Sequence, residues 1–337
     1  MAALDLSIVP QEHRDLVRSV IDSAFGTTAR DVSAVTGGWS GALTYRVDAT
    51  DGRFLVRVET LRGFTRNSYQ YECMRIAADA GIAPPIRHLD AESGLVVMAF
   101  LTHRPLTDHP GGPPAAAQDA GRLLARLHET TPFQTHGDYF DNIPRMFTFL
   151  EGSGRVAPGL LNAHRDGFER IRAAYPWQPD TFVSCHNDPN NQNLLFDGHR
   201  LWLVDWETAT RSDPFIDVAT MAAHVAPTPE LQHLLLSSSL GRPPEPLDQA
   251  RLALMARVTR LQVGCALLCI AVDPATLTQT DLGSMGLDEL HATFARGELV
   301  GGTAAGTIAF AKVMLGMFLE SLETPDLDES LRVVSLA

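Results

Sequence analysis

Three side chains that can bind a metal ion or accept a proton lie close together in one segment of the chain. Residues 185–207 read CHNDPNNQNLLFDGHRLWLVDWE and contain Asp188, Asn193 and Asp205. A carboxylate and an amide that converge on one point form a hard-oxygen site suited to Mg²⁺, and a second carboxylate nearby can accept a proton. The residue types therefore indicate a magnesium site with a general base beside it.

A predicted β-hairpin would bring these side chains together. Residues 194–196 form a short apolar run, an Asp-Gly pair after them is a strong signal for a tight turn, and residues 201–204 form the returning strand. A hairpin folds its two ends back together, so Asn193 and Asp205 are expected to become neighbours. Asp188, on the loop that enters the hairpin, is expected beside them.

The segment resembles the catalytic core of the kinase superfamily, in which an H-x-D-x-x-x-x-N loop precedes a hairpin and an Asp-led metal motif. Residues 186–193 match the loop, and Asp205-Trp206-Glu207 stands at the metal motif. The motifs H-N-D at 186–188, D-W-E at 205–207 and DPFIDVA at 213–219 are similar to those of the choline kinase and aminoglycoside phosphotransferase group. Glu207 is the third residue of that motif, where it would support the site or contact the substrate.

The resemblance implies a role for each residue of the loop. Asp188 would be the catalytic base, and Asn193 and Asp205 would hold Mg²⁺. His186 would mainly pack and form hydrogen bonds that hold the loop, so its implied role is structural. Asp217 would brace the loop from the start of a helix.

Each residue taken alone has a plainer interpretation. Asp188 precedes a proline and could form a turn, residues 190–193 could be only a polar loop, and Asp217 could be only a helix N-cap. Taken together, spacing, residue type and the predicted hairpin favour a phosphotransferase site.

A glycine cluster lies between two strands expected near the N-terminus. Gly37, Gly38 and Ser40 belong to the sequence TGGWSG, between strands expected at 32–34 and 43–47. Glycines in such a turn allow backbone N–H groups to approach phosphates. The resemblance implies that this loop covers the phosphates of ATP, although relatives often carry G-G-x-T-N. By itself the cluster is more often a plain hairpin turn.

Arg57 is the basic residue expected to bind the α- and β-phosphates of the nucleotide. It lies on a strand expected at 53–58, where Val56 and Val58 would point to the opposite face. Protein kinases use lysine at this place, but the single lysine of the chain is Lys312, far away in the sequence. The alternative is an exposed arginine on an edge strand.

Two further residues are implied at the nucleotide site. A helix expected at 67–80 carries Glu72, which the resemblance pairs with Arg57, although other acids nearby compete for that place. Met98 lies in a strand expected at 95–100, which would lead into the hinge that binds adenine. It would line the nucleotide pocket, but a core methionine is the default interpretation.

These elements predict an α+β, protein-kinase-like bilobal fold with ATP between the lobes. Residues 1–101 would form a nucleotide-binding lobe around a small mixed β-sheet, and residues 102–337 a larger, mainly helical lobe that carries the catalytic and substrate-binding residues. Residues 130–144 are expected to be a loop. Helices are expected at 115–129, at 147–174 with a break near 152–159, and at 219–226, 229–240, 247–272 and 288–320.

The composition is that of an ordinary globular protein and limits its partners. A chain of 337 residues with 45% hydrophobic residues can bury a sizeable core. The net charge of −13 argues against broad nucleic-acid binding, which needs a basic surface. The four cysteines form no C-x-x-C pair and no zinc spacing, so they are interpreted as reduced, buried thiols.

One segment resembles a membrane span in length. Residues 301–319 are almost uninterrupted apolar and small residues, but Lys312 lies well inside them, so a buried helix is favoured. Residues 1–14 show no basic region followed by an apolar core. We therefore expect a cytoplasmic protein without a membrane partner; the sequence does not indicate its oligomeric state.

The predicted function is ATP- and Mg²⁺-dependent transfer of the γ-phosphate to the hydroxyl of a small molecule. An unspecified small alcohol or amino alcohol ranks first as the acceptor, a choline-like one second and an aminoglycoside third. One alternative is a pseudokinase, a nucleotide-binding regulator without catalysis, which the arginine at 57 and the altered glycine loop would suit. Another is a metal-dependent hydrolase, which would need a cluster of His and carboxylates to activate water, and only His186 is near.

Overall fold

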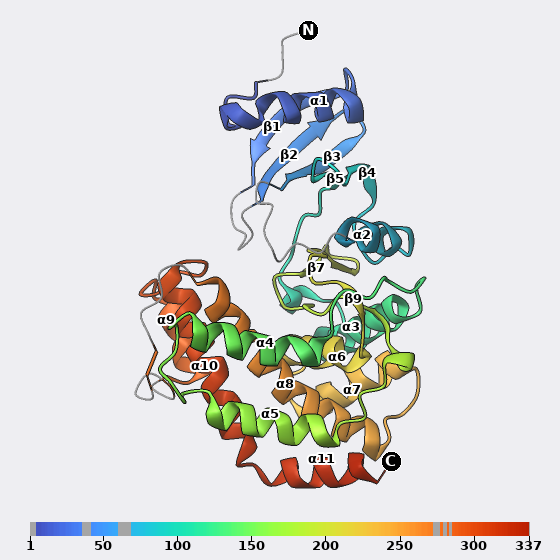
Figure 1. Cartoon of the computed structure of the whole chain (residues 1–337). Coiled ribbons are helices and arrows are strands. Elements are labelled where there is room, and N and C mark those ends of the chain that lie inside the picture. Colours follow the sequence, from blue (N-terminus) through green and yellow to red (C-terminus); the bar gives the residue numbers. More distant parts are fainter. Residues whose placement is uncertain are drawn as a thin grey trace.

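The polypeptide forms a small lobe built on a sheet and a larger helical lobe (Figure 1). This computed structural model describes residues 5–35, 42–59, 69–271, 277–278, 282 and 285–336. Over these residues the α+β class and the two lobes that the sequence predicts are confirmed.

The small lobe is built on a five-stranded sheet of order β1-β2-β3-β5-β4. Every neighbouring pair is antiparallel, so the prediction of a mixed sheet was wrong. Short connections such as those between β2 and β3 and between β4 and β5 return the chain directly, whereas parallel pairing needs a crossover. The strands are β1 (Ala29–Ala34), β2 (Leu43–Ala49), β3 (Gly52–Val58), β4 (Ile86–Asp90) and β5 (Leu95–Ala99).

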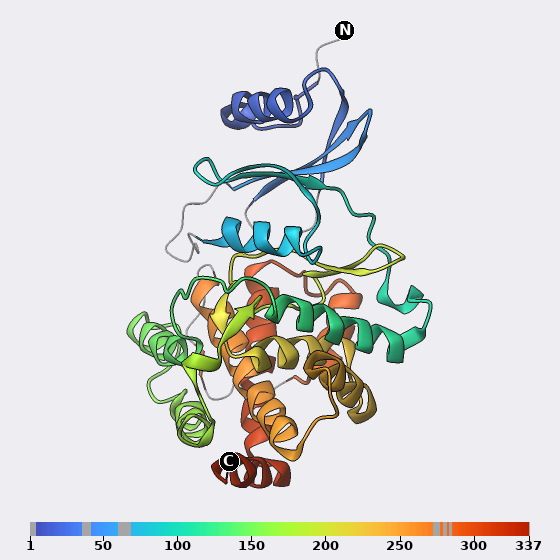
Figure 2. The same cartoon turned by 90° about the vertical axis from the view of Figure 1, so that its right-hand side faces the viewer.

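A helix covers each face of this sheet, α1 (Arg14–Phe25) on one side and α2 (Gln70–Asp79) on the other (Figure 2). Strand β5 shows the alternation that makes this possible, because successive side chains point to opposite faces. Leu95 and Val97 lie in the core under α1. Val96 and Met98 join the core that α2 shares with the larger lobe, so α2 connects the two lobes.

The larger lobe contains helices α3 to α11. The helices predicted around α3, α6, α7 and α8 are confirmed, and so is the break after α4. The bounds are α3 (Gly112–His128), α4 (Tyr139–Gly152), α5 (Asn162–Ala174), α6 (Pro214–Val225), α7 (Pro229–Leu240), α8 (Pro246–Ile270), α9 (Leu287–Ala295), α10 (Ala304–Leu322) and α11 (Pro325–Ser335).

Helix α4 begins inside the segment 130–144 that was predicted to be a loop. The Asp138 side chain accepts the Asp141 backbone N–H at 3.1 Å and so caps the first turn. Phe140, in that first turn, is only 1% exposed. Its burial outweighs the weak helix signal of the sequence, even with Pro144 inside the helix.

The single helix predicted at 288–320 is two helices, α9 and α10. Gly297 and Gly302 lie between them with φ of 72° and 77°. This left-handed backbone ends a helix and is favoured at glycine. The chain therefore turns between α9 and α10, and the turn contributes to a surface beside the 186–193 loop.

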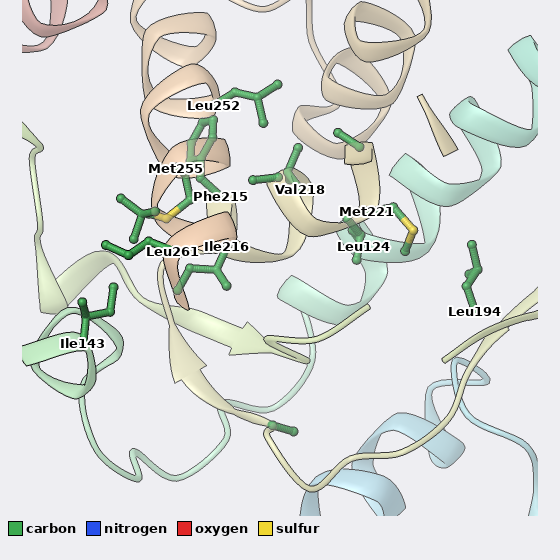
Figure 3. Packing of buried hydrophobic residues seen from close by; sticks show 14 of the residues in the cluster. Leu124, Ile143, Leu194, Phe215, Ile216, Val218, Met221, Leu252, Met255 and Leu261 are labelled. Carbon is green, nitrogen blue, oxygen red and sulfur yellow. The ribbon is translucent and has the colours of Figure 1, made fainter. Parts of the chain in front are cut away.

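The core of the larger lobe lies where α3, α6 and α8 meet (Figure 3). Leu124 of α3, Phe215 and Ile216 of α6, and Met255 and Leu261 of α8 are at most 3% exposed. Full burial of such a side chain contributes about 1.5–3 kcal/mol. Helix α6 is therefore fixed firmly, which matters because its first turn carries Asp217.

Two helices, α8 and α10, are long and apolar enough to cross a membrane by length and composition. Half of each apolar window is buried inside the fold. The two helices pack closely against each other, since a Cβ at Gly264 of α8 would lie 2.9 Å from the Leu315 side chain of α10. Both are interpreted as core helices, as expected for residues 301–319.

Candidate active site

The predicted hairpin forms and places Asn193 next to Asp205. Its strands are β7 (Leu194–Phe196) and β8 (Leu201–Leu203), paired antiparallel. The backbone N–H of Val204 donates to the Asn193 carbonyl at 3.0 Å, which extends the pairing by one step. The two predicted metal ligands therefore lie at the open end of one hairpin.

Asp217 fixes the loop that enters the hairpin. Its buried carboxylate accepts the backbone N–H groups of His186 at 3.0 Å and Asn187 at 2.7 Å, and the ring N–H of His128 at 3.1 Å. Asn187 has φ of 64°, an unfavourable conformation that these bonds offset. The N-cap of α6 is Asp213, not Asp217. Asp217 thus has the bracing geometry implied by its sequence context.

His186 is buried and holds the loop against the hairpin. Its Nε2–H donates to the Val204 carbonyl at 2.9 Å, and its ring packs against Trp206 with centroids 4.7 Å apart. Burial lowers the pKa of His186, although the Asp217 charge opposes this shift. A neutral, enclosed imidazole fits the structural role predicted for it.

Asp188 is the half-buried carboxylate of the loop. It accepts hydrogen bonds from Asn190 Nδ2 at 2.9 Å and Asn193 Nδ2 at 3.3 Å. Burial raises the pKa of Asp188 to about 7; the Asn190 bond lowers it, and the charges of Asp205 and other nearby acids raise it. A carboxylate that titrates near neutral pH is well suited to accept a proton in that range.

The donor set at Asn193 and Asp205 fits a divalent cation. Asn193 donates through Nδ2 to the Asp188 backbone carbonyl at 2.9 Å, which leaves its amide oxygen available as a ligand. Asp205 has φ of 66°, and its side chain is 29% exposed. Carboxylate and amide oxygens are the ligands that Mg²⁺ prefers.

Arg57 reaches this donor set from the small lobe. Val56 and Val58 are buried in the core under α1, so Arg57 points to the opposite face, as predicted. Its Nη2 lies 3.3 Å from Asp205 Oδ1, and its side chain is only 11% exposed. Arg57 is therefore an enclosed cation beside Asp205 on an inner strand, and the alternative of an exposed edge-strand arginine was wrong.

Glu207 lies in the same charged cluster. Burial raises the pKa of Glu207 and the neighbouring Asp205 and Glu59 charges raise it further, whereas Arg57 lowers it. The supporting role of Glu207 stays a prediction.

The predicted pair between Glu72 and Arg57 is not formed. Glu72 Oε2 accepts from Gln134 Nε2 at 3.0 Å, so it ties α2 to the segment before α4. Glu59, directly after β3, accepts from the Tyr71 hydroxyl at 2.6 Å. Glu72 thus contacts the larger lobe instead of the cation on β3.

Of the remaining residues predicted at the nucleotide site, one lies among the described residues and three do not. Met98 is 7% exposed and lies in the core on the α2 side of the sheet, so its contact with a nucleotide stays a prediction. Gly37, Gly38 and Ser40 lie outside the described residues.

Sequence reasoning missed several residues that support the site. His128 ends α3 and bonds Asp217, but a histidine at a helix end carries no specific signal. Asp213 accepts the Phe215 backbone N–H at 2.8 Å and pairs with Arg251 at 2.8 Å. Its position before proline could have identified it as an N-cap.

Tyr139, the first residue of α4, also belongs to the surroundings of the site. Burial raises the pKa of Tyr139, and the nearby charges of Asp188 and Asp217 raise it further. The sequence contained no specific signal for this residue, because the start of α4 was predicted to be a loop.

A family model described as the phosphotransferase enzyme family matches residues 31–248. This span is most of the chain and contains every site residue predicted from the sequence. The chain belongs to this family. It is therefore a small-molecule phosphotransferase, and the loop, hairpin and brace are the parts of the fold that position its charged residues.

A curated relative and solved structures agree with this assignment. Protein LicA of Haemophilus influenzae is 25% identical over 197 residues, which cover 55% of this chain and 71% of the relative. A choline/ethanolamine kinase family protein from Mesorhizobium loti has a TM-score of 0.69 and 20% identity, over 96% of this chain and 99% of the other.

Two further structures share the fold. Choline kinase LicA from Streptococcus pneumoniae matches with a TM-score of 0.63 and 16% identity, over 91% of this chain and all of the other. Spectinomycin phosphotransferase APH(9)-Ia, solved with ADP and spectinomycin, matches with a TM-score of 0.58 and 12% identity, over 96% and 98%. The kinase-like, two-lobed fold predicted from the sequence is thereby confirmed.

Proposed function

We propose that this phosphotransferase moves the γ-phosphate of ATP, in the presence of Mg²⁺, to the hydroxyl of a small amino alcohol. The single observation that carries the proposal is the environment of Asp188. This carboxylate has a pKa of about 7 and is held by Asn193 beside Asp205, which contacts the cation Arg57. Base, metal ligands and phosphate-binding cation thus converge at one place.

Different residues bind the phosphates of the nucleotide and the metal ion. Arg57 is the cation for the α- and β-phosphates, and the amide oxygen of Asn193 and the carboxylate of Asp205 would hold Mg²⁺. When bound, the metal neutralises charge on the β- and γ-phosphate oxygens. Arg57 contacts Asp205 at 3.3 Å, so its guanidinium is already at the site where that negative charge arrives.

Asp188 acts on the acceptor. Its carboxylate orients the acceptor hydroxyl and takes its proton while the acceptor oxygen forms a bond to the γ-phosphorus. The bond between the γ-phosphorus and the bridging β-oxygen breaks, and ADP leaves with that oxygen. The bonds from Asn190 and Asn193 fix the carboxylate before the reaction, which reduces the reorganisation needed in the transition state.

Three observations support an amino alcohol as the acceptor. The D-W-E motif at 205–207 suits the choline kinase group, and two of the matched structures carry choline or ethanolamine kinase in their names. A net charge of −13 is compatible with a cationic substrate. An aminoglycoside is the main alternative, because the fold is shared with a spectinomycin phosphotransferase.

The test is ADP release by the purified protein with Mg²⁺ and ATP, against choline, ethanolamine, aminoglycosides, sugars and small alcohols. Acceptor-dependent ADP release that Asp188→Asn abolishes would establish the proposal and identify the acceptor. Tight binding of ATP without turnover on any acceptor would favour a nucleotide-binding regulator. One observation favours the hypothesis of a regulator without catalysis: Arg57 pairs with Asp205, and the pair with Glu72 that the family resemblance implies is not formed.

A further inference from the structure

A histidine, a cysteine and an aspartate from three separate elements meet beneath the 186–193 loop. His128 ends α3, Cys185 ends β6 (Val183–Cys185), and Asp217 lies in the first turn of α6. One ligand atom of each residue, the imidazole nitrogen, the sulfur and a carboxylate oxygen, lies within 4.8 Å of the other two. Eighty-nine positions separate His128 from Asp217, so no spacing in the sequence could indicate this group.

This group of three residues is enclosed by the fold. The side chains of Cys185 and Asp217 are fully buried, and the side chain of His128 is 11% exposed. Imidazole, thiolate and carboxylate are the ligands that zinc takes in proteins, and here they converge in the interior rather than on a solvated surface. The exposed edge of the His128 ring is the side from which an ion can enter.

The hydrogen bonds of Asp217 leave a place for an ion. Its Oδ1 accepts the Asn187 N–H at 2.7 Å, and its Oδ2 accepts the His186 N–H at 3.0 Å and the His128 Nε2–H at 3.1 Å. A carboxylate has about four lone-pair sites. An ion that replaces the proton between His128 and Asp217 therefore leaves both bonds from the loop backbone intact.

The distance between the nitrogen and oxygen ligands suits tetrahedral zinc. Zn–N and Zn–O bonds are about 2.0–2.1 Å long, which at a tetrahedral angle places the two ligand atoms about 3.3 Å apart. His128 Nε2 and Asp217 Oδ2 already lie 3.1 Å apart. The pair has to open by only a few tenths of an ångström to hold the ion.

The sulfur of Cys185 supplies the third ligand. Its thiol now donates only a weak hydrogen bond, to the Ser212 carbonyl at 3.4 Å. Burial and the nearby charge of Asp217 raise the pKa of Cys185, so the thiol keeps its proton until an ion takes its place. His128 moves its ring proton to Nδ1 and stays neutral, so binding releases one proton, from Cys185, to the solvent.

The ligand types distinguish this group from the proposed Mg²⁺ site. Thiolate and imidazole prefer Zn²⁺, whereas Mg²⁺ prefers oxygen ligands such as those of Asn193 and Asp205. The two ions therefore bind at different places, and an excess of Mg²⁺ does not compete for the group at Cys185.

We propose that His128, Cys185 and Asp217 bind one Zn²⁺ ion, which links α3, β6 and α6 beneath the 186–193 loop. The ion joins elements that hydrogen bonds and packing otherwise hold together, and so strengthens the brace of the loop at Asp217. The inference goes beyond the proposed function, because the ion needs neither the nucleotide nor the acceptor.

The first test measures zinc binding by the full chain after treatment with EDTA and desalting, with Mg²⁺ in excess and no nucleotide. Titration of Zn²⁺ against a chromophoric chelator gives the stoichiometry and the Kd. We expect one Zn²⁺ per chain and a Tm about 5 °C higher when Zn²⁺ is at about a hundred times its Kd. A Kd above about 10 μM, far weaker than that of structural zinc sites, or an unchanged Tm would overturn the proposal.

The second test removes one ligand at a time. His128→Gln keeps an amide donor for Asp217 but loses the imidazole, and Cys185→Ser loses the thiolate. Each variant should raise the Kd for Zn²⁺ at least about a hundredfold, because even substitutions behind a ligand cost about tenfold to a hundredfold. The matched control is Cys73→Ser, which changes the same atom at another buried cysteine and should keep the Kd within about twofold. If Cys185→Ser fails to fold, His128→Gln decides; equal Kd values in all variants would refute the site.

A third measurement identifies the sulfur ligand with Cd²⁺ in place of Zn²⁺. A thiolate bound to cadmium gives a charge-transfer absorption in the ultraviolet that nitrogen and oxygen ligands do not give. The band is expected in the natural chain and in Cys73→Ser, and it should be lost in Cys185→Ser. A band that persists in Cys185→Ser would place the ion at another cysteine and overturn the proposal, as would its absence from the natural chain. None of these outcomes depends on phosphotransfer, so the proposed function stands or falls separately.

Discussion

Arg57 and Asp205 form an ion pair between the two lobes, with 3.3 Å between Nη2 and Oδ1. The arginine comes from β3 of the small lobe and the aspartate from the end of the hairpin in the larger lobe. A cation that is only 11% exposed beside the carboxylate proposed to bind Mg²⁺ is at the position where, under the proposed function, the nucleotide phosphates and the metal would meet. The partner of Arg57 is Asp205 and not Glu72 of α2.

This arrangement separates the roles of Arg57 and Glu72. Arg57→Ala should raise the Kd of Mg·ATP by about tenfold to a hundredfold, because hydrogen bonds to charged groups contribute about 1.5–3 kcal/mol. Glu72→Gln should leave that Kd within about twofold, since Glu72 bonds Gln134 instead. Calorimetric titration of both variants decides the matter. An equal loss of Mg·ATP affinity in both variants would mean that Glu72 also contributes to nucleotide binding.

The pKa of Asp188 predicts the pH dependence of the reaction. Below pH 7 the carboxyl is mostly protonated and cannot accept the hydroxyl proton, so kcat/KM for the acceptor should fall about tenfold per pH unit. Above pH 7 the rate should level off. Initial rates from pH 5 to 9, with saturating ATP, measure this. A profile that is flat between pH 5 and 8 would remove Asp188 from the role of base.

The same pKa has a consequence for stability. The folded-state pKa of Asp188 lies above the usual value for aspartate, so the folded protein binds this proton more tightly than the unfolded chain. Its favourable contribution is complete below the unfolded-state pKa and is lost as the pH rises through about 7. Asp188→Asn should therefore melt at a higher temperature than the natural chain at pH 8, with the difference vanishing near pH 4. Calorimetric melting at both pH values tests the sign; a lower Tm at pH 8 would contradict it.

Asp217 and Asp213 offer a matched pair of buried carboxylates at the start of α6. Asp217→Asn loses an acceptor for the loop N–H groups, so we expect a loss of about 1–3 kcal/mol and a marked drop in kcat. Asp213→Asn weakens the cap of α6 and the bond to Arg251, which should lower stability while kcat changes much less. Melting curves and kcat for both variants are compared. An equal effect on kcat would mean that Asp217 acts only through stability.

The hairpin and the nearness of Asn193 to Asp205 could be predicted because their signals are local. The turn residues, the two short apolar runs and the polar residues at fixed spacing lie within 185–207 of the sequence. The partner of Glu72 could not be predicted, since it depends on how α2 packs on the larger lobe, and Gln134 is sixty-two positions away. The turn between α9 and α10 was missed because no proline separates the two helices, and only the backbone of Gly297 and Gly302 marks the break.

A last prediction concerns the packing that supports the site. Gly121 of α3 lies against α7, where an added Cβ would meet the Leu235 carbonyl oxygen at 2.4 Å and the Ser238 Cβ at 2.7 Å. Alanine favours a helix over glycine by about 1 kcal/mol, but overpacking in a tight contact costs about 1–3 kcal/mol. The clash is with backbone and cannot relax easily, so Gly121→Ala should lower the free energy of unfolding. The control is Gly152→Ala at the end of α4, where nothing lies within 4 Å of the added Cβ and stability should be equal or higher. Denaturant unfolding measures the free energy of unfolding of both variants. A Gly121→Ala variant that is more stable than the natural chain would show that α3 and α7 can move apart to accommodate the added methyl group.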